Sequence, residues 1–449
     1  MIGGTLNTLA KIVDGRTQGA DAPWRGVSTD SRSIGHGELF IALNGPNHRG
    51  RDFVKSVAGS GAAAALVDRF TDDEIAQVEV YDTRHALGVL AADWREQFDF
   101  TVIGVTGSNG KTSVKQMIAA CLGENALATR GNFNNDIGVP KMLLELDATH
   151  SSAVFEMGAN HAGEIAYLAS LVRPTIAVIT NAGPSHLEGF GSVDGVAHAK
   201  GELFYALNSE ATAIVNRDDR YFDLWCELAA PATVKSFGLS AAADCYADNI
   251  SLGVSHSDFD LVIGEERYPV RLPLPGEHNV LNACAAALAV HASGIDLRLI
   301  AQRLVTSISE KGRLMARRTN DGALVIDDTY NANPASMRAA ARHAVGLDKP
   351  VLMVLGDMGE LGPDAEALHF SLGQDFAKIG VERLAVCGDL MAHTAEGFAG
   401  NARHFDSQAA LIDALLLEDL SQYTVLVKGS RSQAMENVVA ALVPAEGRA

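Results

Sequence analysis

The sequence predicts an α/β protein of three domains, with a central parallel sheet to which antiparallel strands are appended and a doubly wound, Rossmann-like C-terminal domain. Three observations support this fold class. The 449 residues correspond to about three domains of roughly 150 residues each. Short apolar runs alternate with helix-like stretches along most of the chain, as in βαβ units. One such run, TVIGVT, leads directly into the Gly-rich segment GSNGKTS, so the central sheet is predicted to carry a P-loop.

The composition excludes several classes of protein. Hydrophobic residues make up 47% of the chain and charged residues 20%, with 43 Gly and 13 Pro, a profile that excludes collagen, coiled coil and intrinsic disorder. The formal net charge is −19 and the chain has no Lys- and Arg-rich block, so we expect no nucleic acid partner. An anionic ligand must therefore be held by a local device, such as a helix N-terminus or a few placed cations.

The cysteines and the first residues predict the compartment. The five cysteines are widely spaced and form no C-x-x-C pair, which favours a reducing compartment over disulfide, zinc or iron–sulfur chemistry. The N-terminal segment lacks the basic region of a signal peptide, and no apolar run approaches the roughly 18 residues that a membrane span needs. We expect a cytoplasmic protein without a membrane span, and a monomer.

The first domain is predicted over residues 1–98 and the central domain over residues 99–312. In the first domain, apolar runs such as FIAL and AAAALV alternate with helix-like stretches. In the central domain, four strand-like runs end immediately before Gly107, Glu156, Asn181 and Asn216. Open parallel sheets bind ligands at the carboxyl ends of their strands, so these four positions are candidates for one site.

The rest of the chain shows two further patterns. Between Thr233 and Leu274, short polar–apolar alternations predict antiparallel strands appended to the central sheet. The Ala-rich segment GEHNVLNACAAALAVHASG predicts a helix that stops at Gly294. After Gly312, the runs ALVIDD, PVLMVLGD, RLAVCGD and TVLVKGS predict a second doubly wound domain over residues 313–449.

The Gly-rich loop has the residue types of a phosphate-binding site. Gly107 and Gly110 let the backbone turn its N–H groups inward. Lys111 offers a charge to the terminal phosphates, and the Thr112 hydroxyl can ligate Mg²⁺. The usual pattern begins with Gly where this chain has Val105, so the loop is a variant. The alternative is a tight strand–helix turn with a surface lysine, but the apolar strand before the loop and the helix after it favour nucleotide binding.

Two later strand ends predict a metal site. Glu156 follows the run SAVF, and His186 follows IAVIT in the segment ITNAGPSHLEGFGS. Either residue alone is usually an ordinary surface or capping residue. Together, beside a P-loop, they are interpreted as Mg²⁺ ligands, although His is a less usual partner for that hard cation. From the residues alone, Lys200 in HAKGELF is interpreted as a solvated helix lysine.

Five segments in order resemble the central domain of the Mur ligases, the ATP-dependent amino-acid ligases of peptidoglycan synthesis. These segments are TGSNGKTS, GNFNNDIGVP, EMGANHAGEI, NAGPSHLEGFGS with AHAKGELF, and GEHNVLNACAA. Within the family, DDTYNANPASM, LGDMGELG, KGSR and the N-terminal STDSRSIGHGELFIALNG are most similar to members that join D-alanyl-D-alanine to a UDP-N-acetylmuramoyl tripeptide. The resemblance spans the whole chain and implies ligation through an acyl phosphate.

The resemblance implies a role for each matching residue. The ATP phosphates would be held by Gly107, Ser108, Asn109, Gly110, Lys111, Thr112 and Ser113. Adenine would contact Asn282, and ATP would be met from the C-terminal domain by Arg313 and Asp328. The resemblance also implies that Thr112 and Glu156 hold one Mg²⁺. A second Mg²⁺ would be held by His186 and by Lys200 as a carbamylated lysine, because carbamylation turns an ammonium into an anionic oxygen ligand.

The same resemblance implies two substrate sites. Asn331 and Asn333 would line the site of the incoming dipeptide, and Ser31 and Arg32 would contact the UDP part of the acceptor. From the resemblance, the expected catalytic residues are Lys111, Lys200 and His186. The chain departs from its relatives at PNHRGRDF, where Arg49 and Arg51 replace the acidic residue and His that related ligases more often carry.

Three alternatives to a dipeptide-adding ligase are less consistent with the sequence. The D-N-P-R segment by which related ligases select a diamino acid is absent, which disfavours the preceding enzyme of the pathway. A nucleotide-dependent switch without ligation would leave Glu156, His186 and Lys200 without a role, and the chain has no N-K-x-D segment for guanine. A folate-glutamate ligase of the same superfamily would leave the first domain, residues 1–98, without a role. The dipeptide-adding ligase is the favoured interpretation.

Overall fold

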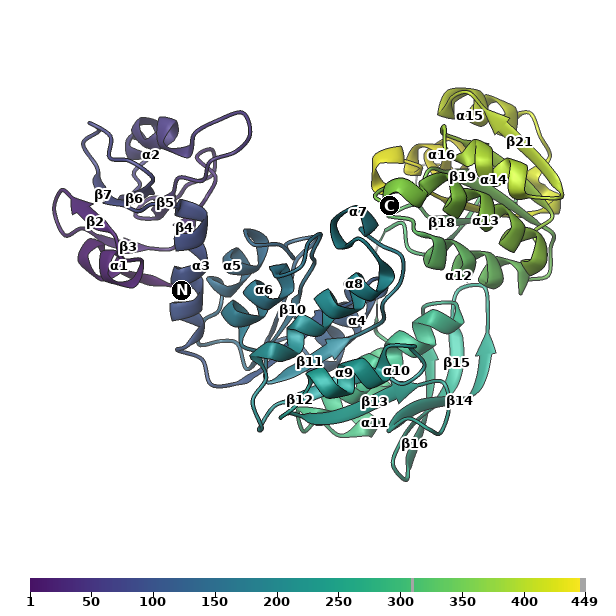
Figure 1. The fold of residues 1–449 in the computed structure, drawn as a ribbon, viewed down its shortest axis with the longest axis horizontal. Coiled ribbons are helices and arrows are strands. Elements are labelled where there is room, and N and C mark those ends of the chain that lie inside the picture. The colour runs from purple at the N-terminus through teal and green to yellow at the C-terminus, as the bar shows by residue number, and fades with distance from the viewer. Residues whose placement is uncertain (308–310, 445–449) are drawn as a thin grey trace.

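The structure, a computed structural model, describes residues 1–307 and 311–444. Within these ranges the strands form a two-stranded, a five-stranded, a nine-stranded and a six-stranded sheet. Figure 1 shows them following one another along the molecule, from the purple N-terminal part through the blue and teal central part to the green and yellow C-terminal part. Residues 445–449 of the predicted C-terminal domain lie outside the described residues.

The N-terminal part is a small α/β unit, as predicted. Its elements are β1 (Gly3–Thr5), α1 (Leu6–Ile12), β2 (Arg16–Gln18), β3 (Pro23–Arg25), β4 (Val27–Ser28), β5 (Leu39–Ile41), η1 (Gly50–Phe53), α2 (Val54–Gly59), β6 (Ala64–Val67), β7 (Ala76–Glu79) and α3 (Thr83–Arg95). The five-stranded sheet has the order β2-β7-β6-β5-β4, in which β4 to β7 are parallel and β2 is antiparallel. β5 and β6 are wholly buried apolar runs, because both of their faces are covered.

The central part is built around one large sheet. Its strands are β8 (Thr101–Thr106), β9 (Ala126–Ala128), β10 (Ser152–Glu156), β11 (Ile176–Ile179), β12 (Thr212–Asn216), β13 (Thr233–Gly238), β14 (Cys245–Leu252), β15 (Ser257–Ile263) and β16 (Glu266–Leu272). The order is β16-β15-β14-β13-β12-β11-β8-β10-β9. β8 has β11 on one side and β10 on the other, so the strand order reverses at β8, and ligands bind outside the carboxyl ends of strands at such a point.

Helices cover both faces of the central sheet. They are α4 (Lys111–Leu122), α5 (Gly138–Leu143), α6 (Glu164–Val172), α7 (Leu187–Phe190), α8 (Val193–Gly201), η2 (Glu202–Ala206), α9 (Phe222–Leu228), α10 (Glu277–Ala292) and α11 (Leu297–Leu304). α10 is the predicted Ala-rich helix, and it packs on α4 and on the strands. α3 packs on α5 and α6, which joins the N-terminal part to the central part.

The appended antiparallel strands are confirmed with one correction. β14, β15 and β16 pair antiparallel, but β13, at the start of the predicted stretch, runs parallel to β12. The helix α9 between β12 and β13 is a crossover connection of the kind that parallel pairing requires.

The C-terminal part is a second doubly wound sheet, as predicted. Its elements are β17 (Met315–Arg318), β18 (Leu324–Asp328), α12 (Pro334–Val345), β19 (Val351–Gly356), η3 (Gly362–Asp364), α13 (Ala365–Ile379), β20 (Arg383–Cys387), α14 (Met391–Gly397), β21 (Asn401–Phe405), α15 (Gln408–Leu416), η4 (Leu420–Gln422), β22 (Thr424–Lys428), η5 (Arg431–Gln433) and α16 (Glu436–Leu442). The order is β17-β18-β22-β19-β20-β21, with β17 antiparallel and the other strands parallel. In the described part of the chain, no helix is long and apolar enough to cross a membrane.

Candidate active site

The P-loop joins β8 to α4 at the middle of the central sheet. Gly107 has φ +147° and Gly110 has φ +80°, a region that L side chains rarely adopt. A Cβ at Gly107 would lie 1.9 Å from Oγ1 of Thr180, and one at Gly110 would lie 2.4 Å from Oδ1 of Asn282. Both glycines are therefore required by the backbone conformation and by close approach.

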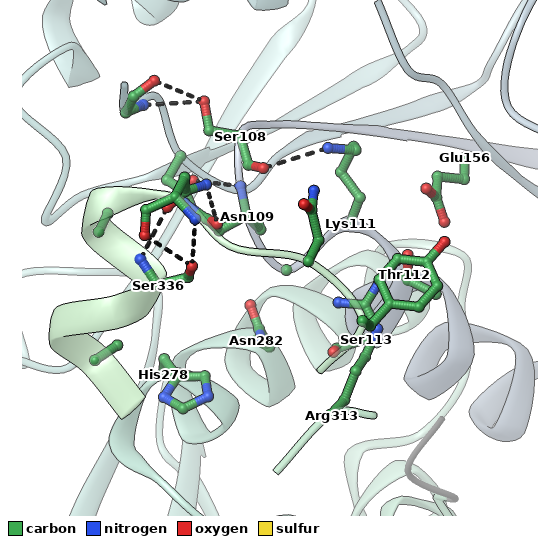
Figure 2. Close-up of a pocket in the computed structure, with 18 of the residues that line it drawn as sticks. Ser108, Asn109, Lys111, Thr112, Ser113, Glu156, His278, Asn282, Arg313 and Ser336 are labelled. Atoms are coloured by element: carbon green, nitrogen blue, oxygen red, sulfur yellow. Dashed lines mark hydrogen bonds between the residues drawn. The ribbon is translucent and has the colours of Figure 1, made fainter. Parts of the chain in front are cut away.

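The loop is fixed by the strand that lies beside it. The Ser108 amide donates to the Asn181 carbonyl oxygen at 2.9 Å, and the Asn109 amide donates to Asn181 Oδ1 at 2.9 Å. Lys111 Nζ donates to the Gly107 carbonyl oxygen at 2.6 Å. It also donates to the Ser108 carbonyl oxygen at 3.4 Å, the bond drawn in Figure 2, so its ammonium lies over the loop. Burial lowers the pKa of Lys111, and the charge of Glu156 opposes that shift.

Glu156 at the end of β10 presents an unsatisfied carboxylate oxygen. Its Oε1 accepts from Asn134 Nδ2 at 2.8 Å, and its backbone amide donates to Thr129 Oγ1 at 3.0 Å. The side chain is buried, and Oε2 has no hydrogen-bond partner among the described residues. A buried anionic oxygen without a partner is unfavourable, so this oxygen is suited to a cation.

Residues of α10 and of the segment between α11 and β17 face the P-loop. Asn282 Nδ2 donates to Asn279 Oδ1 at 3.3 Å, and both side chains are buried. Arg313 (Figure 2) donates from a terminal guanidinium nitrogen to Thr112 Oγ1 at 3.1 Å. Its guanidinium carbon also lies 4.4 Å from the centre of the Tyr330 ring. Arg313 therefore connects the start of the C-terminal part to the residue after the P-loop lysine.

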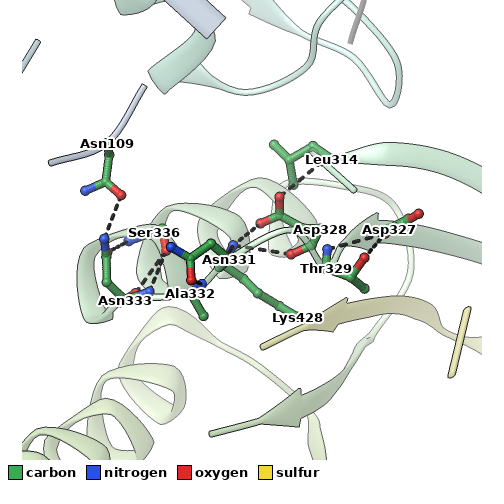
Figure 3. A network of polar contacts seen from close by, with 10 residues as sticks. All are labelled: Asn109, Leu314, Asp327, Asp328, Thr329, Asn331, Ala332, Asn333, Ser336 and Lys428. Carbon is green, nitrogen blue, oxygen red and sulfur yellow. Dashed lines mark hydrogen bonds and ion pairs between the residues drawn. The ribbon is translucent and has the colours of Figure 1, made fainter. Parts of the chain in front are cut away.

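A second group of polar contacts organises the loop after β18. Asp328 Oδ2 lies 2.6 Å from Lys428 Nζ at the end of β22, and its Oδ1 accepts from the Leu314 amide at 3.2 Å. Lys428 Nζ also donates to the Asn331 carbonyl oxygen at 2.8 Å (Figure 3). The Lys428 side chain is 4% exposed, so a buried lysine holds the loop that carries Asn331.

Asn333 has both ends of its amide engaged. Its Oδ1 accepts from the Ser336 amide at 2.9 Å and caps α12, and the Ser336 hydroxyl accepts from the Asn333 amide at 3.0 Å. Its Nδ2 donates to Asn109 Oδ1 at 2.8 Å (Figure 3). The loop after β18 is thus tied directly to the P-loop.

These residues line one cavity of about 610 Å³ between the central and C-terminal sheets. The predicted residues on its walls are Ser108, Asn109, Gly110, Lys111, Thr112, Ser113, Glu156, His186, Asn282, Arg313, Asp328, Asn331 and Asn333. Gly107 and Lys200 are not among the lining residues. The structure therefore brings together most of the site that the sequence predicted from segments far apart in the chain.

His186 and Lys200 flank α7. His186 immediately precedes α7, and its Nδ1 lies 2.6 Å from Oε2 of Glu360, which follows β19. Lys200 on α8 is 1% exposed, with Nζ 5.2 Å from the Phe190 ring centroid. The interpretation of Lys200 as a solvated lysine is therefore wrong. Burial, together with the charge of Lys111, lowers the pKa of Lys200 to about 7.

The predicted UDP contacts lie outside this cavity. Ser31 and Arg32 follow β4 in the N-terminal part, and the exposed Arg32 guanidinium makes two hydrogen bonds to Asp30, at 2.9 and 2.7 Å. Arg51 lies 3.3 Å from Asp68, with both side chains mostly buried, whereas Arg49 is exposed. Arg51 therefore has a structural partner within its own part of the chain.

Several residues at or near the cavity were given no role by the sequence analysis. Asn134 lies in the quoted segment GNFNNDIGVP and Lys428 lies in KGSR, so each had a motif but no assigned role. His278 lines the cavity beside Asn282, and burial lowers its pKa to about 4. Glu360 lies in LGDMGELG. Only the glycines of this segment had been interpreted, as turn residues after a strand, so Glu360 had no assigned role.

The fold and the cavity together define a nucleotide-dependent P-loop enzyme built from several α/β units. Three stretches match descriptions of one family: residues 23–95 match "Mur ligase family, catalytic domain", residues 105–290 match "Mur ligase middle domain" and residues 312–431 match "Mur ligase, glutamate ligase domain". The chain belongs to the Mur ligase family, as its motifs indicated.

Relatives and solved structures agree with this assignment. The UDP-N-acetylmuramoyl-tripeptide--D-alanyl-D-alanine ligase of Escherichia coli K12 is 42% identical over 447 residues, which cover 98% of this chain and 99% of the relative. A crystal structure of MurF from Acinetobacter baumannii superposes with a TM-score of 0.94 at 38% identity, covering 98% and 99% of the two chains. A MurF ligase from Thermotoga maritima in complex with ADP gives a TM-score of 0.83 at 25% identity, covering 93% and 97%.

Proposed function

We propose that this protein is an ATP-dependent ligase that joins D-alanyl-D-alanine to a UDP-N-acetylmuramoyl tripeptide, through an acyl phosphate, in peptidoglycan precursor synthesis. The observation that carries the proposal is the similarity, over nearly the whole chain, to the E. coli ligase named for these two substrates. The cavity supports it, because the P-loop, the buried Glu156 and the loop after β18 face one another across it.

The nucleotide site follows from the P-loop geometry. The residues from Gly107 to Ser113 would surround the phosphates, with the positive end of α4 and the Lys111 ammonium supplying the charge. Asn282 would contact adenine, and Arg313 and Asp328 would meet ATP from the C-terminal side. Similarity to a ligase solved with ADP supports nucleotide binding here.

The residues fit Mg²⁺ at one position. Glu156 Oε2 is a buried carboxylate oxygen without a hydrogen-bond partner among the described residues, and Thr112 Oγ1 lies at the start of α4. In the described ranges no three His, Cys, Asp or Glu side chains cluster as a metal site, so the remaining oxygen ligands would come from the nucleotide phosphates and water. Bound Mg²⁺ would neutralise the charge on the phosphate oxygens.

We propose that Lys200 is carbamylated and holds a second Mg²⁺ with His186. Carbamylation joins the neutral amine to CO₂, with a C–N bond formed and one proton released, and yields an anionic carboxylate. Burial disfavours the charged form of Lys200 and outweighs the opposing charges of Glu202 and Glu164, so its pKa falls to about 7 and the neutral amine becomes available. The burial of Lys200 therefore supports the modification.

The chain's own residues would act in two steps. The tripeptide carboxylate attacks the γ-phosphorus of ATP and ADP leaves, while Lys111 stabilises the charge on the transferring phosphoryl group. The neutral amine of D-alanyl-D-alanine then attacks the acyl carbon, and inorganic phosphate leaves as the C–N bond forms. Asn331 and Asn333 would orient this amine, because both lie on the loop that faces the P-loop.

Each of the three predicted domains would bind one of the substrates. Residues 1–98 would hold the UDP part of the acceptor through Ser31 and Arg32, residues 99–312 would hold ATP, and residues 313–449 would hold the dipeptide. We also propose that the protein is a monomer and that it is cytoplasmic. The five cysteines, which are all free thiols, support a reducing compartment.

Phosphate release from the purified protein tests the function. With ATP and Mg²⁺, release should require both the UDP-muramoyl tripeptide and D-alanyl-D-alanine. Release with a UDP-muramoyl dipeptide and a diamino acid, but none with D-alanyl-D-alanine, would assign the protein to the neighbouring ligase. Release with a folate and glutamate would assign it to the folate-glutamate ligases, and ATP binding without any acceptor-dependent release would indicate a switch.

A further inference from the structure

Glu360 connects the C-terminal part to the residue that begins α7. Its side chain meets the His186 ring, with Nδ1 of His186 2.6 Å from Oε2 of Glu360. Its backbone makes a second contact, because the Leu187 amide donates to the Glu360 carbonyl oxygen at 3.0 Å. In Figure 1, α7 lies beside the green C-terminal part, and α7 and η3 are in contact. One residue thus holds both the ring and the backbone at the start of this helix.

Both partners adopt an unusual backbone conformation. Glu360 has φ +60° and His186 has φ +50°, in the left-handed region that non-Gly residues seldom occupy. Such conformations persist where surrounding contacts impose them, and they cluster at functional sites. The two strained residues are here in direct contact with each other across the junction between the central and C-terminal parts.

Stability alone does not explain the pair. The Glu360 side chain is 61% exposed, and ion pairs with this much solvent around them contribute little to folding. A carboxylate that contributes little to folding but lies 2.6 Å from a ring nitrogen has another effect, which is to fix the proton on that nitrogen.

The fixed proton determines which nitrogen can bind a metal. A neutral histidine carries one N–H, and a carboxylate that accepts from Nδ1 leaves the lone pair on Nε2. Metal-ligating histidines almost always donate their other ring N–H to such a partner, and this partner orients the ring. His186 lines the cavity, so Nε2 is the nitrogen that this arrangement leaves for a ligand.

We propose that Glu360 is a positioning residue, which fixes the orientation and tautomer of His186 from the C-terminal side and thereby completes the second metal site. The inference rests on the proposed function, since that function places His186 in a Mg²⁺ site. The second metal site would then depend on a residue of the proposed dipeptide-binding part. Metal binding at this site and docking of the C-terminal part would therefore be coupled.

Manganese binding tests the inference without relying on turnover. Mn²⁺ replaces Mg²⁺, a non-hydrolysable ATP analogue is added, and bound Mn²⁺ is counted by electron paramagnetic resonance. Glu360→Ala should weaken the second Mn²⁺ by about 10- to 100-fold, and should reduce the ¹⁴N coupling that reports histidine ligation. Glu360→Gln should lie between Ala and the wild type, because its amide oxygen still accepts from Nδ1.

Two comparisons isolate the route through His186. Glu366→Ala, at an exposed position in the first turn of α13, should bind Mn²⁺ like the wild type. In a His186→Ala background, Glu360→Ala should have no further effect on Mn²⁺ binding, because its effect passes through that ring.

The outcomes separate this inference from the proposed function. If the wild type ligates and binds a second Mn²⁺ but Glu360→Ala binds it equally tightly, the positioning role is overturned and the function stands. If Glu360→Ala raises only the KM for D-alanyl-D-alanine, Glu360 contacts the donor and the positioning role is again overturned. If the wild type neither ligates nor binds a second Mn²⁺, the proposed function fails and this inference with it.

Discussion

Replacing Lys200 with Ala removes the amine that we propose to be carbamylated. CO₂ reacts with the neutral amine, and with a pKa of about 7 roughly half of the Lys200 side chains are neutral at pH 7. A lysine at its ordinary pKa of 10.5 has about one neutral side chain in 3,000 at that pH. The burial of Lys200 therefore raises the reactive fraction by roughly 10³.

We expect Lys200→Ala to lose at least about 10²-fold in ligation rate, because an oxygen ligand near the transferring phosphoryl group is gone. Short carboxylic acids should partly restore activity by occupying the vacated space. In the wild type, activity should fall as pH drops below about 7, since protonation removes the amine that CO₂ needs, and added bicarbonate should offset part of that loss.

The control for this experiment is Lys378→Ala, whose side chain on α13 is 74% exposed. Lys115, to which the sequence assigns no catalytic role, is unsuitable as a control because it is fully buried and its Nζ donates to the Thr129 carbonyl oxygen at 2.9 Å. Full activity of Lys200→Ala, or a metal-bound structure with a bare ammonium at Lys200, would refute the carbamate assignment.

Three further predictions concern residues that line the cavity between the central and C-terminal sheets. Lys111→Ala should reduce ligation by about 10² to 10³ with an unchanged circular dichroism spectrum, and near-native turnover would contradict the P-loop assignment. Gly110→Ala should abolish ATP binding measured by calorimetry, because its Cβ would lie 2.4 Å from Asn282 Oδ1 at a φ of +80°. The pKa of His278 is about 4 in the folded protein against 6.5 ordinarily, so the unfolded chain takes up the proton first as pH falls. Urea unfolding should therefore show stability declining between these two pH values by up to about 1.4 kcal/mol per pH unit, and His278→Gln should reduce that slope.

The sequence predicts the strand ends well, for a physical reason. Buried parallel strands are continuous apolar runs, so the change to a polar or Gly residue marks where each strand ends. Gly107 after β8 and Glu156 at the end of β10 were found in this way, and the register of β8 with β10 brings them to the same edge of the sheet. Two neighbouring strand ends were enough to predict a site there.

Two of the edge strands, β9 and β21, were missed because they lack that signal. β9 has three residues, and β21 reads NARHF with mostly exposed side chains. Each pairs on one side only, with β10 and β20 respectively, so neither needs the apolar run of a buried strand. The side chains that meet across the junction, such as Glu360 at His186, were missed for a different reason. Their proximity depends on how the central and C-terminal sheets pack against each other. The local pattern of apolar and polar residues carries no information about that packing.

Asn333 shows how a residue assigned by resemblance acquires a second constraint from the fold. Its Oδ1 accepts from the Ser336 amide in the cap of α12, and one N–H of its Nδ2 donates to Asn109 Oδ1. A side-chain amide has two N–H groups and two acceptor lone pairs, so the second N–H of Nδ2 stays available for a dipeptide. The bond to Asn109 fixes the plane of the amide and therefore the direction in which this second N–H points. The P-loop would thus help to orient a group proposed for the dipeptide site, and this connection follows from the packing of two sheets and not from either motif.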